Sequence, residues 1–316
     1  VKVRGWPLLR GEIVADNLSV DKARVAIGPL LPGSKTVESD FALDWTGEVD
    51  LKHSMTSVGR AVGKLASAIA DAGLTSVRFD DVQLVGFDQL GLRMRHARLQ
   101  QLVLEQDADT GKGLVVSGKL ASDQNTLSLD GSWKESDTGG KLLQLSLSGL
   151  DMQDVLVNPE ATPSQYLKMD SPLTLKLDAS FDQAGAPQPA SVALSVGAGS
   201  FVLGDAIKTT LSEARLNLSL LPDKNQIELE PSPIRFKKTK AVLQGGLRFA
   251  DGLETQPLFE VLANEVVAFS MKSEAEGAPG ALQISGSVDR QRKHIIAETL
   301  LIKTPSGQMV GDGLLD

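Results

Sequence analysis

The 316-residue sequence contains no cysteine, which excludes disulfides, thiolate metal sites and cysteine nucleophiles. Its three histidines, His53, His96 and His294, stand far apart. We interpret them as solvated side chains, because a metal site needs ligands that converge. No apolar run reaches the roughly twenty residues that a membrane-spanning helix needs. No signal peptide is visible, and both ends of the sequence resemble cuts, so we expect a fragment of a longer protein.

Aromatic residues are scarce, at 4% of the chain, and Leu and Val supply most of the apolar content. A compact β-sandwich or a sugar-binding site usually has more aromatic anchors. The net charge of -8 lacks the basic footprint of a nucleic-acid-binding surface, so we expect no nucleic-acid partner.

Catalytic signatures are also missing. The carboxylates fall mostly in turns, where Asp hydrogen-bonds to its own backbone. No GxSxG motif is present, and the glycines at 197–199 and 245–246 lie within or between expected strands rather than before a helix, which argues against a phosphate cradle. We therefore expect no enzyme, no catalytic residue, no metal and no cofactor. A carboxylate pair drawn from distant strands, as in polysaccharide-acting enzymes, stays open as an alternative.

Alternation of apolar and polar residues dominates the chain and is clearest from Ser191 to Phe249. Spacing of two places one face of each strand against a dry surface and the other against water. Polar turns separate the strands every ten to fifteen residues or so, which is typical of an antiparallel meander. The pattern predicts a mostly β fold: one long, strongly curved antiparallel sheet over residues 1–316, with a candidate sub-boundary near residues 158–163. A register change at Asp80–Asp81 indicates a bulge.

Residues 54–74 form the single convincing helix in the pattern, and it is amphipathic. Its apolar stripe consists of Val58, Val62, Leu65, Ile69 and Ala72. Ser54 or Thr56 is expected to cap its start and Gly73 to end it. We interpret it as a plug at the open end of the sheet. A membrane-surface helix is the alternative, which the small number of Lys and Arg residues on its polar face disfavours.

One helix cannot cover the apolar face of so many strands, and a large uncovered apolar face normally marks a binding surface. We therefore expect an elongated hydrophobic groove that binds acyl chains, with each buried CH₂ contributing roughly 0.8 kcal/mol. The candidate groove residues are Leu114, Val116, Leu127, Leu129, Leu145, Leu147, Leu175, Leu177, Val192, Leu194, Leu216, Leu218, Ile227, Leu229, Leu247 and Phe249. The alternation is equally compatible with a closed sandwich of two sheets that acts as a structural or interaction module.

Three basic clusters remain: one at residues 93–98, one at residues 235–240 and one at residues 290–294. In the first two, basic residues alternate with apolar ones, which makes them the outer face of strands. Solvation and protection of strand edges account for them. Contact with anionic lipid headgroups or with a partner protein is the alternative.

Three features of the sequence resemble the AsmA-like group of Gram-negative envelope proteins, which includes TamB and YhdP. They are GEIVADNLSVDKARVAI near the start, the passage SVGRAVGKLASAIADAGLTSVRFDDVQL at 57–84, and Leu-rich strands such as LSLDGSW at 127–133 and AVLQGGLRFADG at 241–252. The resemblance implies a β-taco-like sheet that encloses a hydrophobic groove. It also implies a periplasmic location, an inner-membrane anchor outside this sequence, and phospholipid transport in outer-membrane biogenesis. Phospholipid, the membrane and an envelope protein are the partners it implies.

Overall fold

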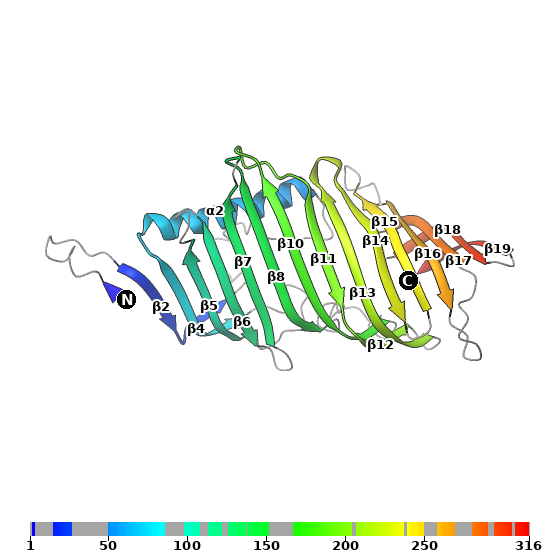
Figure 1. Ribbon diagram of the computed structural model, residues 1–316, viewed down its shortest axis with the longest axis horizontal. Helices are drawn as coiled ribbons and strands as arrows, with labels where there is room; N and C mark the ends of the chain where they lie inside the picture. Colours follow the sequence, from blue (N-terminus) through cyan, green and yellow to red (C-terminus); the bar gives the residue numbers. More distant parts are fainter. Residues whose placement is uncertain are drawn as a thin grey trace, which may run out of the picture.

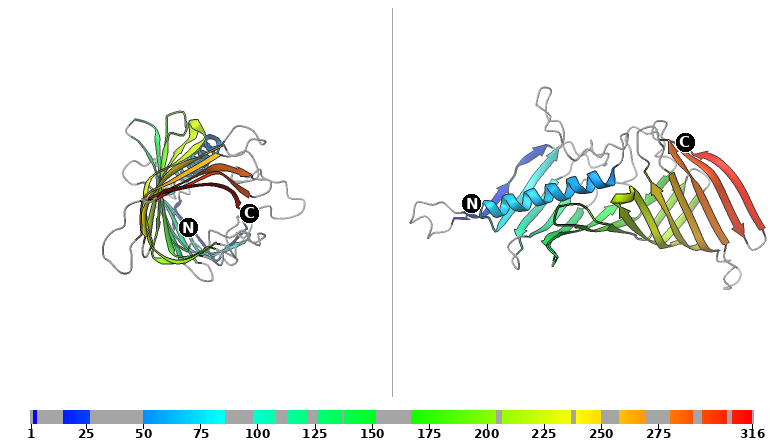
Figure 2. Two further views of the ribbon diagram at one scale, coloured as in Figure 1. Left: turned by 90° about the vertical axis from the view of Figure 1, so that its right-hand side faces the viewer. Right: turned by 90° about the horizontal axis from the view of Figure 1, so that it is seen from above.

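The computed structural model describes residues 2–3, 15–26, 50–85, 98–107, 113–121, 126–136, 138–151, 167–203, 207–236, 239–249, 258–268, 280–289, 294–304 and 307–315. The described residues are mostly β, and their nineteen strands belong to one sheet. Strands β2 and β19 lie toward opposite ends of the long axis (Figure 1). Viewed end on, the strands curve strongly (Figure 2). The prediction of one large curved sheet with one helix is confirmed for this part of the chain.

The elements follow one another along the chain as a long series of strands. The strands before and after the helix are β1 (Lys2–Val3), β2 (Ala15–Asp21), β3 (Arg24–Ala26), β4 (Ser76–Val85), β5 (Arg98–Gln106), β6 (Leu114–Ala121), β7 (Thr126–Glu135), β8 (Lys141–Asp151), β9 (Leu167–Asp170) and β10 (Pro172–Phe181). The second part comprises β11 (Ala190–Val196), β12 (Gly199–Leu203), β13 (Ile207–Leu221), β14 (Gln226–Phe236), β15 (Thr239–Arg248), β16 (Leu258–Ala268), β17 (Gly280–Asp289), β18 (His294–Thr304) and β19 (Gly307–Leu315). A short 3₁₀ helix, η3 (Pro222–Lys224), connects β13 to β14.

From β4 to β19 the sheet is antiparallel, and most strands pair with the next strand along the chain. The short strands β9 and β12 are the exceptions, because β8 pairs with β10 and β11 pairs with β13. Strand β9 precedes β10 and pairs with β12, while β10 pairs with β11, and both β11 and β12 pair with β13. The candidate sub-boundary at 158–163 lies outside the described residues.

The N-terminal strands depart from the predicted antiparallel sheet. Strands β2 and β3 both pair with β4 in parallel. Parallel neighbours need a long crossover connection, because the chain must return to the same end of the sheet. Helix α2 (Leu51–Asp71) belongs to that connection. The prediction of an antiparallel sheet is therefore wrong for these two pairs.

Helix α2 is the only α-helix in the described part of the chain, and it begins earlier than its apolar pattern indicates. Asp50 is the N-cap, and its side chain accepts a hydrogen bond of 2.8 Å from the backbone N–H of His53. Ser54 and Thr56, the predicted caps, lie inside the helix. The predicted end is confirmed, because Gly73 follows the C-cap residue Ala72 and has a φ of 67°, a conformation that glycine adopts without strain.

Helix α2 crosses the strands rather than closing one end of the sheet (Figure 2). Its C-terminal part packs near β4, where Ile69 joins the same cluster as Val77. At its N-terminal end the backbone N–H of Leu51 donates to Oδ1 of Asn225, which follows η3, at 3.0 Å. A helix of 21 residues is about 31 Å long, and the seven interstrand steps from β4 to β13 span about 34 Å. The helix therefore covers this part of the sheet, and the interpretation as an end plug is wrong.

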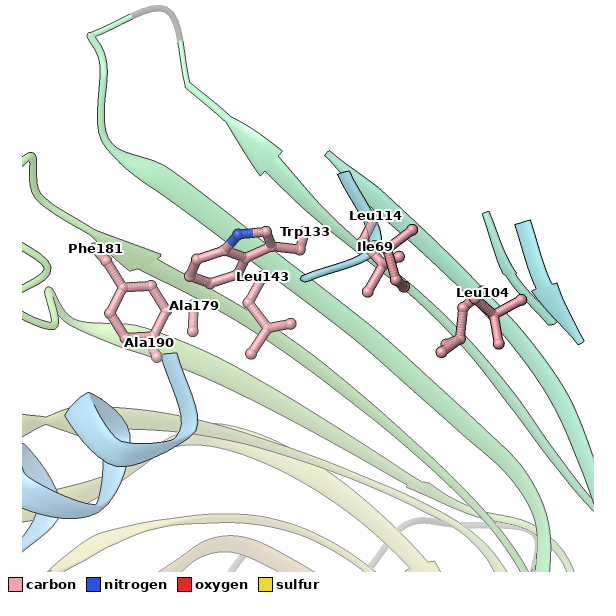
Figure 3. Close-up of a cluster of buried hydrophobic side chains, with 9 residues drawn as sticks. Ile69, Leu104, Leu114, Trp133, Leu143, Ala179, Phe181 and Ala190 are labelled. Atoms are coloured by element: carbon pink, nitrogen blue, oxygen red, sulfur yellow. The ribbon is translucent and has the colours of Figure 1, made fainter. Parts of the chain in front are cut away.

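The core under α2 is built at one rim of the sheet. Its buried members, several of which are labelled in Figure 3, are Ile69, Val77, Leu104, Leu114, Trp133, Leu143, Ala179, Phe181 and Ala190. The rings of Trp133 and Phe181 lie 5.4 Å apart and tilted, an arrangement that adds to the burial energy of the two rings. A Cβ on Gly59 of α2 would lie 2.6 Å from Cε1 of Phe181. Glycine at this position lets the helix approach the aromatic pair.

Strand β14 contains Pro231 and Pro233, although it lies inside the sheet. Proline cannot donate a ladder hydrogen bond and is normally confined to edges and bulges. The register of β14 shifts against both neighbours in this segment. The fully buried Ser232 Oγ accepts a hydrogen bond of 2.9 Å from the backbone N–H of Asn217. The bulge thus accommodates both prolines while a serine hydroxyl satisfies the neighbouring strand.

Candidate functional site

Apolar residues oppose one another from strand to strand and form two continuous rows across the sheet. Row A consists of Val20, Phe79, Leu102, Gly118, Leu129, Leu147, Leu175, Leu194 and Leu216. Row B consists of Leu18, Val77, Leu104, Val116, Gly131, Leu145, Leu177, Val192, Leu218, Leu229 and Gly245. Residues that oppose each other in register share a face of the sheet. We call the face with rows A and B the apolar face and its opposite the polar face.

Neither row contains a polar or charged side chain. Leucine side chains of neighbouring strands occupy the space beside Gly118 of row A and Gly131 of row B. A Cβ on Gly131 would lie 2.6 Å from Cδ2 of Leu145, and a Cβ on Gly118 would lie 3.1 Å from Cδ1 of Leu102. Row A takes eight interstrand steps, which span about 38 Å, and row B takes ten, which span about 48 Å. The backbone register extends row B through β16 to Ile284, Leu300 and Gly311.

Burial differs between the two rows and the rim. Every member of row A is half-buried. Row B is buried only at Val77 and Leu104, which belong to the core under α2. A flat or convex surface would expose isolated leucines further, whereas a filled core would bury them. Row A is thus half-buried along its whole length, and row B lies between it and the helix-covered rim.

The sixteen residues predicted to line a groove fall into three groups. Rows A and B contain most of them. Leu127 alternates with Leu129 on β7, while Ile227 and Leu247 pair with each other, and all three are half-buried. Leu114 is only 1% exposed because α2 covers it, and Phe249 is 5% exposed beyond the end of β15, where its N–H donates to the Asn225 carbonyl. These last two side chains are packed inside the protein.

Two hollows lined by described residues lie on the polar face. The larger, of about 730 Å³, contains Glu228, Glu230, Glu260 and Glu298 among its lining residues. Three of these carboxylates accept hydrogen bonds, Glu230 from Ser219, Glu228 from Gln226 and Glu260 from Gln283. The smaller, of about 310 Å³, lies between β13, β14 and β15 and contains Arg215, Arg235 and Lys240. The described residues hold no group of three or more side chains suited to a metal ion.

Ion pairs elsewhere on the surface shift a few pKa values. The hydrogen bond from Nε of Arg98 to Oδ1 of Asp81 lowers the pKa of the Asp81 carboxyl and raises that of the Arg98 guanidinium. Asp81 also has a φ of 57°, at the position where the sequence indicates a bulge. The hydrogen bond from Arg78 to Asp80, of 2.6 Å, likewise raises the pKa of Arg78. All four groups are solvent-accessible, so these pairs are worth little stability.

Several predicted features lie outside the described residues or side chains. His96, residues 93–95, Lys237, Lys238 and residues 290–293 are among them, and only His53 of the three histidines has a described side chain, which is exposed. Within the described residues, no helix has the length and apolar character needed to cross a membrane. Comparison with known proteins finds no matching family model, curated protein or solved structure.

Sequence reasoning missed two groups of residues. Asn225 and Asp223 hold the N-terminal end of α2, through the bond to Leu51 and an ion pair of 2.8 Å with Lys52. Arg215 completes the basic hollow, although it lies outside the basic cluster at residues 235–240. Their signal is positional: a turn rich in Pro, Asp and Asn, and a lone arginine on the polar face of a long strand.

Proposed function

We propose that this chain binds phospholipid acyl chains on its apolar face and passes them on without catalysing a reaction. The observation that carries the proposal is row A, an uninterrupted line of half-buried apolar residues about 38 Å long. A hydrocarbon bilayer core is about 30 Å thick, so row A offers room for an extended acyl chain and more. The proposal includes a hydrophobic groove formed by the curved sheet. It also includes phospholipid transport in the periplasm, which the AsmA-like resemblance implies.

The energetic argument is the transfer of CH₂ groups from water. Each methylene buried against Leu and Val side chains contributes roughly 0.8 kcal/mol, so a long chain gains several kcal/mol even when part of it stays wet. Leucine-rich rows have no hydrogen-bonding groups to select one lipid over another. The site therefore favours acyl chains as a class, with the headgroup left at the water-facing edge.

A single sheet with one helix also supports binding over a closed structural module. A sandwich of two sheets buries both inner faces fully. Here all described strands belong to one sheet, and the leucines of row A are not buried.

A matched pair of variants on β10 tests the proposal. Leu175 belongs to row A, and Thr174 is its neighbour on the polar face. Leu175→Asp is expected to lower uptake of a fluorescent phospholipid from vesicles about tenfold or more, since a carboxylate beside an acyl chain is strongly unfavourable. Thr174→Asp is expected to leave uptake unchanged. Leu175→Trp, which fills space without adding charge, is expected to reduce uptake with the fold intact.

The wild-type protein supplies the decisive control. Lipid extracted from the purified chain is identified by mass spectrometry. A lipid-free protein that takes up no fluorescent phospholipid, or equal uptake by Leu175→Asp and Thr174→Asp, would contradict the proposal.

A further inference from the structure

The basic hollow on the polar face is formed by three neighbouring strands. Its polar lining residues are Glu213 and Arg215 of β13, Arg235 of β14 and Lys240 of β15. Glu213 opposes Arg235, which in turn opposes Lys240, so these three residues form one line across the sheet. The hollow has a volume of about 310 Å³, which is at the small end of the range for ligand sites.

The proline bulge of β14 sits directly beside this line. Pro233 follows the buried Ser232 and opposes Val242 on β15. Pro233, Ile234, Ala241 and Val242 complete the lining. Pro233 and Val242 lie on the same face as Arg235 and Lys240.

The two arginines of the hollow differ from Arg78 and Arg98, each of which is paired with an aspartate. Within the described residues, neither Arg215 nor Arg235 takes part in an ion pair or a side-chain hydrogen bond, and both are exposed. Glu213 is the one carboxylate that lines the hollow, against three cations. The hollow is therefore locally basic in a chain whose net charge is -8.

We propose that the basic hollow binds a phosphate-type oxyanion, either free in solution or as the headgroup of a lipid. The planar guanidinium fork matches the geometry of phosphate oxygens and binds them in a bidentate manner, while lysine contributes a point charge. Two forks and an ammonium suit a multiply charged anion better than a single carboxylate. Glu213 opposes such an anion and limits its affinity.

The inference stands apart from the acyl-chain proposal, because the hollow and rows A and B lie on opposite faces. The register shows this directly: Arg215 opposes Ser195, which opposes Thr174, whereas Leu216 opposes Leu194, which opposes Leu175. Loss of anion binding thus leaves the apolar face intact, and loss of acyl binding leaves the hollow intact.

The test measures binding of inorganic phosphate by calorimetry at low ionic strength and, separately, sedimentation with vesicles of pure phosphatidylglycerol or pure phosphatidylcholine. The double variant Arg215→Gln with Arg235→Gln is expected to weaken binding about tenfold or more, because two charge-assisted contacts are lost. Glu213→Gln is expected to tighten it, which tests the hollow without removing a cation. Arg248→Gln, an exposed arginine on the same face of β15 but outside the hollow, is the matched control and is expected to change nothing.

Each outcome has one meaning. Phosphate binding that the double variant loses supports a soluble anion as the ligand. Binding only to phosphatidylglycerol vesicles, lost in the same variant, supports a lipid headgroup. No binding of either probe by the wild type, or binding that the double variant and Glu213→Gln leave unchanged, overturns the inference. Uptake of a fluorescent phospholipid by the double variant reports separately on the fold and on the apolar face.

Discussion

Strands β4–β13 and strands β14–β19 share one apolar face, but only the first group lies under a helix. Beneath α2, Leu114, Trp133 and Leu143 are at most 6% exposed. Among the described side chains of β14–β19, no hydrophobic residue is buried; Ile227, Leu229 and Leu247 are half-buried. At the rim, cover by α2 accounts for the difference. The first region also contains a second buried cluster, Leu173, Val196, Leu211 and Ala214, which includes no residue of the helix.

This comparison shows what the helix does and what it leaves open. Leu143 and Leu247 occupy equivalent places in their strands at the same rim of the sheet, but only Leu143 belongs to the core under α2. Helix α2 ends its cover at the turn between β13 and β14, where Asn225 accepts the N–H of Leu51. Beyond that point the same apolar face continues, and none of the described hydrophobic side chains of β14–β19 is buried. In our account the rim under α2 supplies the folded core, while row A and the apolar face of β14 and β15 supply the proposed binding surface.

The largest expected effect compares one truncation in the two regions. Leu143→Ala removes a side chain that is 2% exposed and should lower the free energy of unfolding by about 2–5 kcal/mol. Leu247→Ala removes a half-buried side chain and should cost about 1 kcal/mol, since less apolar area is lost. Urea denaturation followed by tryptophan fluorescence measures both. Equal losses would break the distinction between the two regions.

The next effect concerns how closely α2 docks. A Cβ at Gly59 would meet the Phe181 ring at 2.6 Å, whereas a Cβ at Gly63 would make an ordinary contact of 3.7 Å with Trp133. Gly59→Ala should therefore destabilise by about 1–2 kcal/mol, because overpacking outweighs the gain in helix propensity. Gly63→Ala should stabilise by about 0.5–1 kcal/mol. The same sign for both variants, measured by urea denaturation, would show that the helix is not docked on the aromatic pair.

A smaller, local effect is expected at the N-cap. Asp50→Ala removes the hydrogen bond to the His53 N–H and should cost about 1 kcal/mol of helix stability. Hydrogen exchange should accelerate in α2 and in the rim beneath it, while amides of β16–β19 keep their rates. Asp71→Ala, at the other end of the helix, is the control and should not accelerate exchange, because an acidic residue there opposes the helix dipole. Faster exchange throughout the sheet would mean that the two regions unfold as one.

The smallest effect comes from the ion pair between Lys52 and Asp223. The hydrogen bond to Asp223 raises the pKa of Lys52. The contribution of this ion pair to stability is therefore fully present below the ordinary pKa of lysine, and it is lost as the pH rises through the raised pKa of Lys52. Lys52→Gln should leave the unfolding midpoint at neutral pH almost unchanged, since exposed pairs contribute little. It should also remove the small alkaline loss that the wild type shows. A large drop at neutral pH would make this pair the main tether of α2.

Period-two alternation predicted the strands and their faces, because it requires only that neighbouring side chains point in opposite directions. Leu145, Leu147, Leu175 and Leu177 fall on one face for this reason. The start of α2 was missed because Asp50 and Leu51 continue an apparent strand pattern, and the cap appears only once the backbone turns. Parallel pairing of β2 with β4 depends on where the crossover returns, which alternation does not encode.

The sequence also did not show which strands α2 covers. Leu114 and Leu247 both belong to strands with alternating apolar residues, yet only Leu114 lies under α2. Which strands a helix crosses depends on its length and on both of its attachments, and Asn225 is distant in sequence from Leu51. The basic hollow likewise requires the register of three strands, which brings Arg215 beside Arg235 and Lys240.

The central claim is that acyl chains occupy the apolar face where the helix does not cover it. A phospholipid with a photoreactive group on its acyl chain, bound and irradiated, gives cross-linked peptides that mass spectrometry can assign to residues. Our account predicts that the cross-links fall on row A and on apolar-face residues of β14 and β15, such as Leu229 and Leu247. Cross-links confined to polar-face residues, or none after saturating exposure to the lipid, would contradict it.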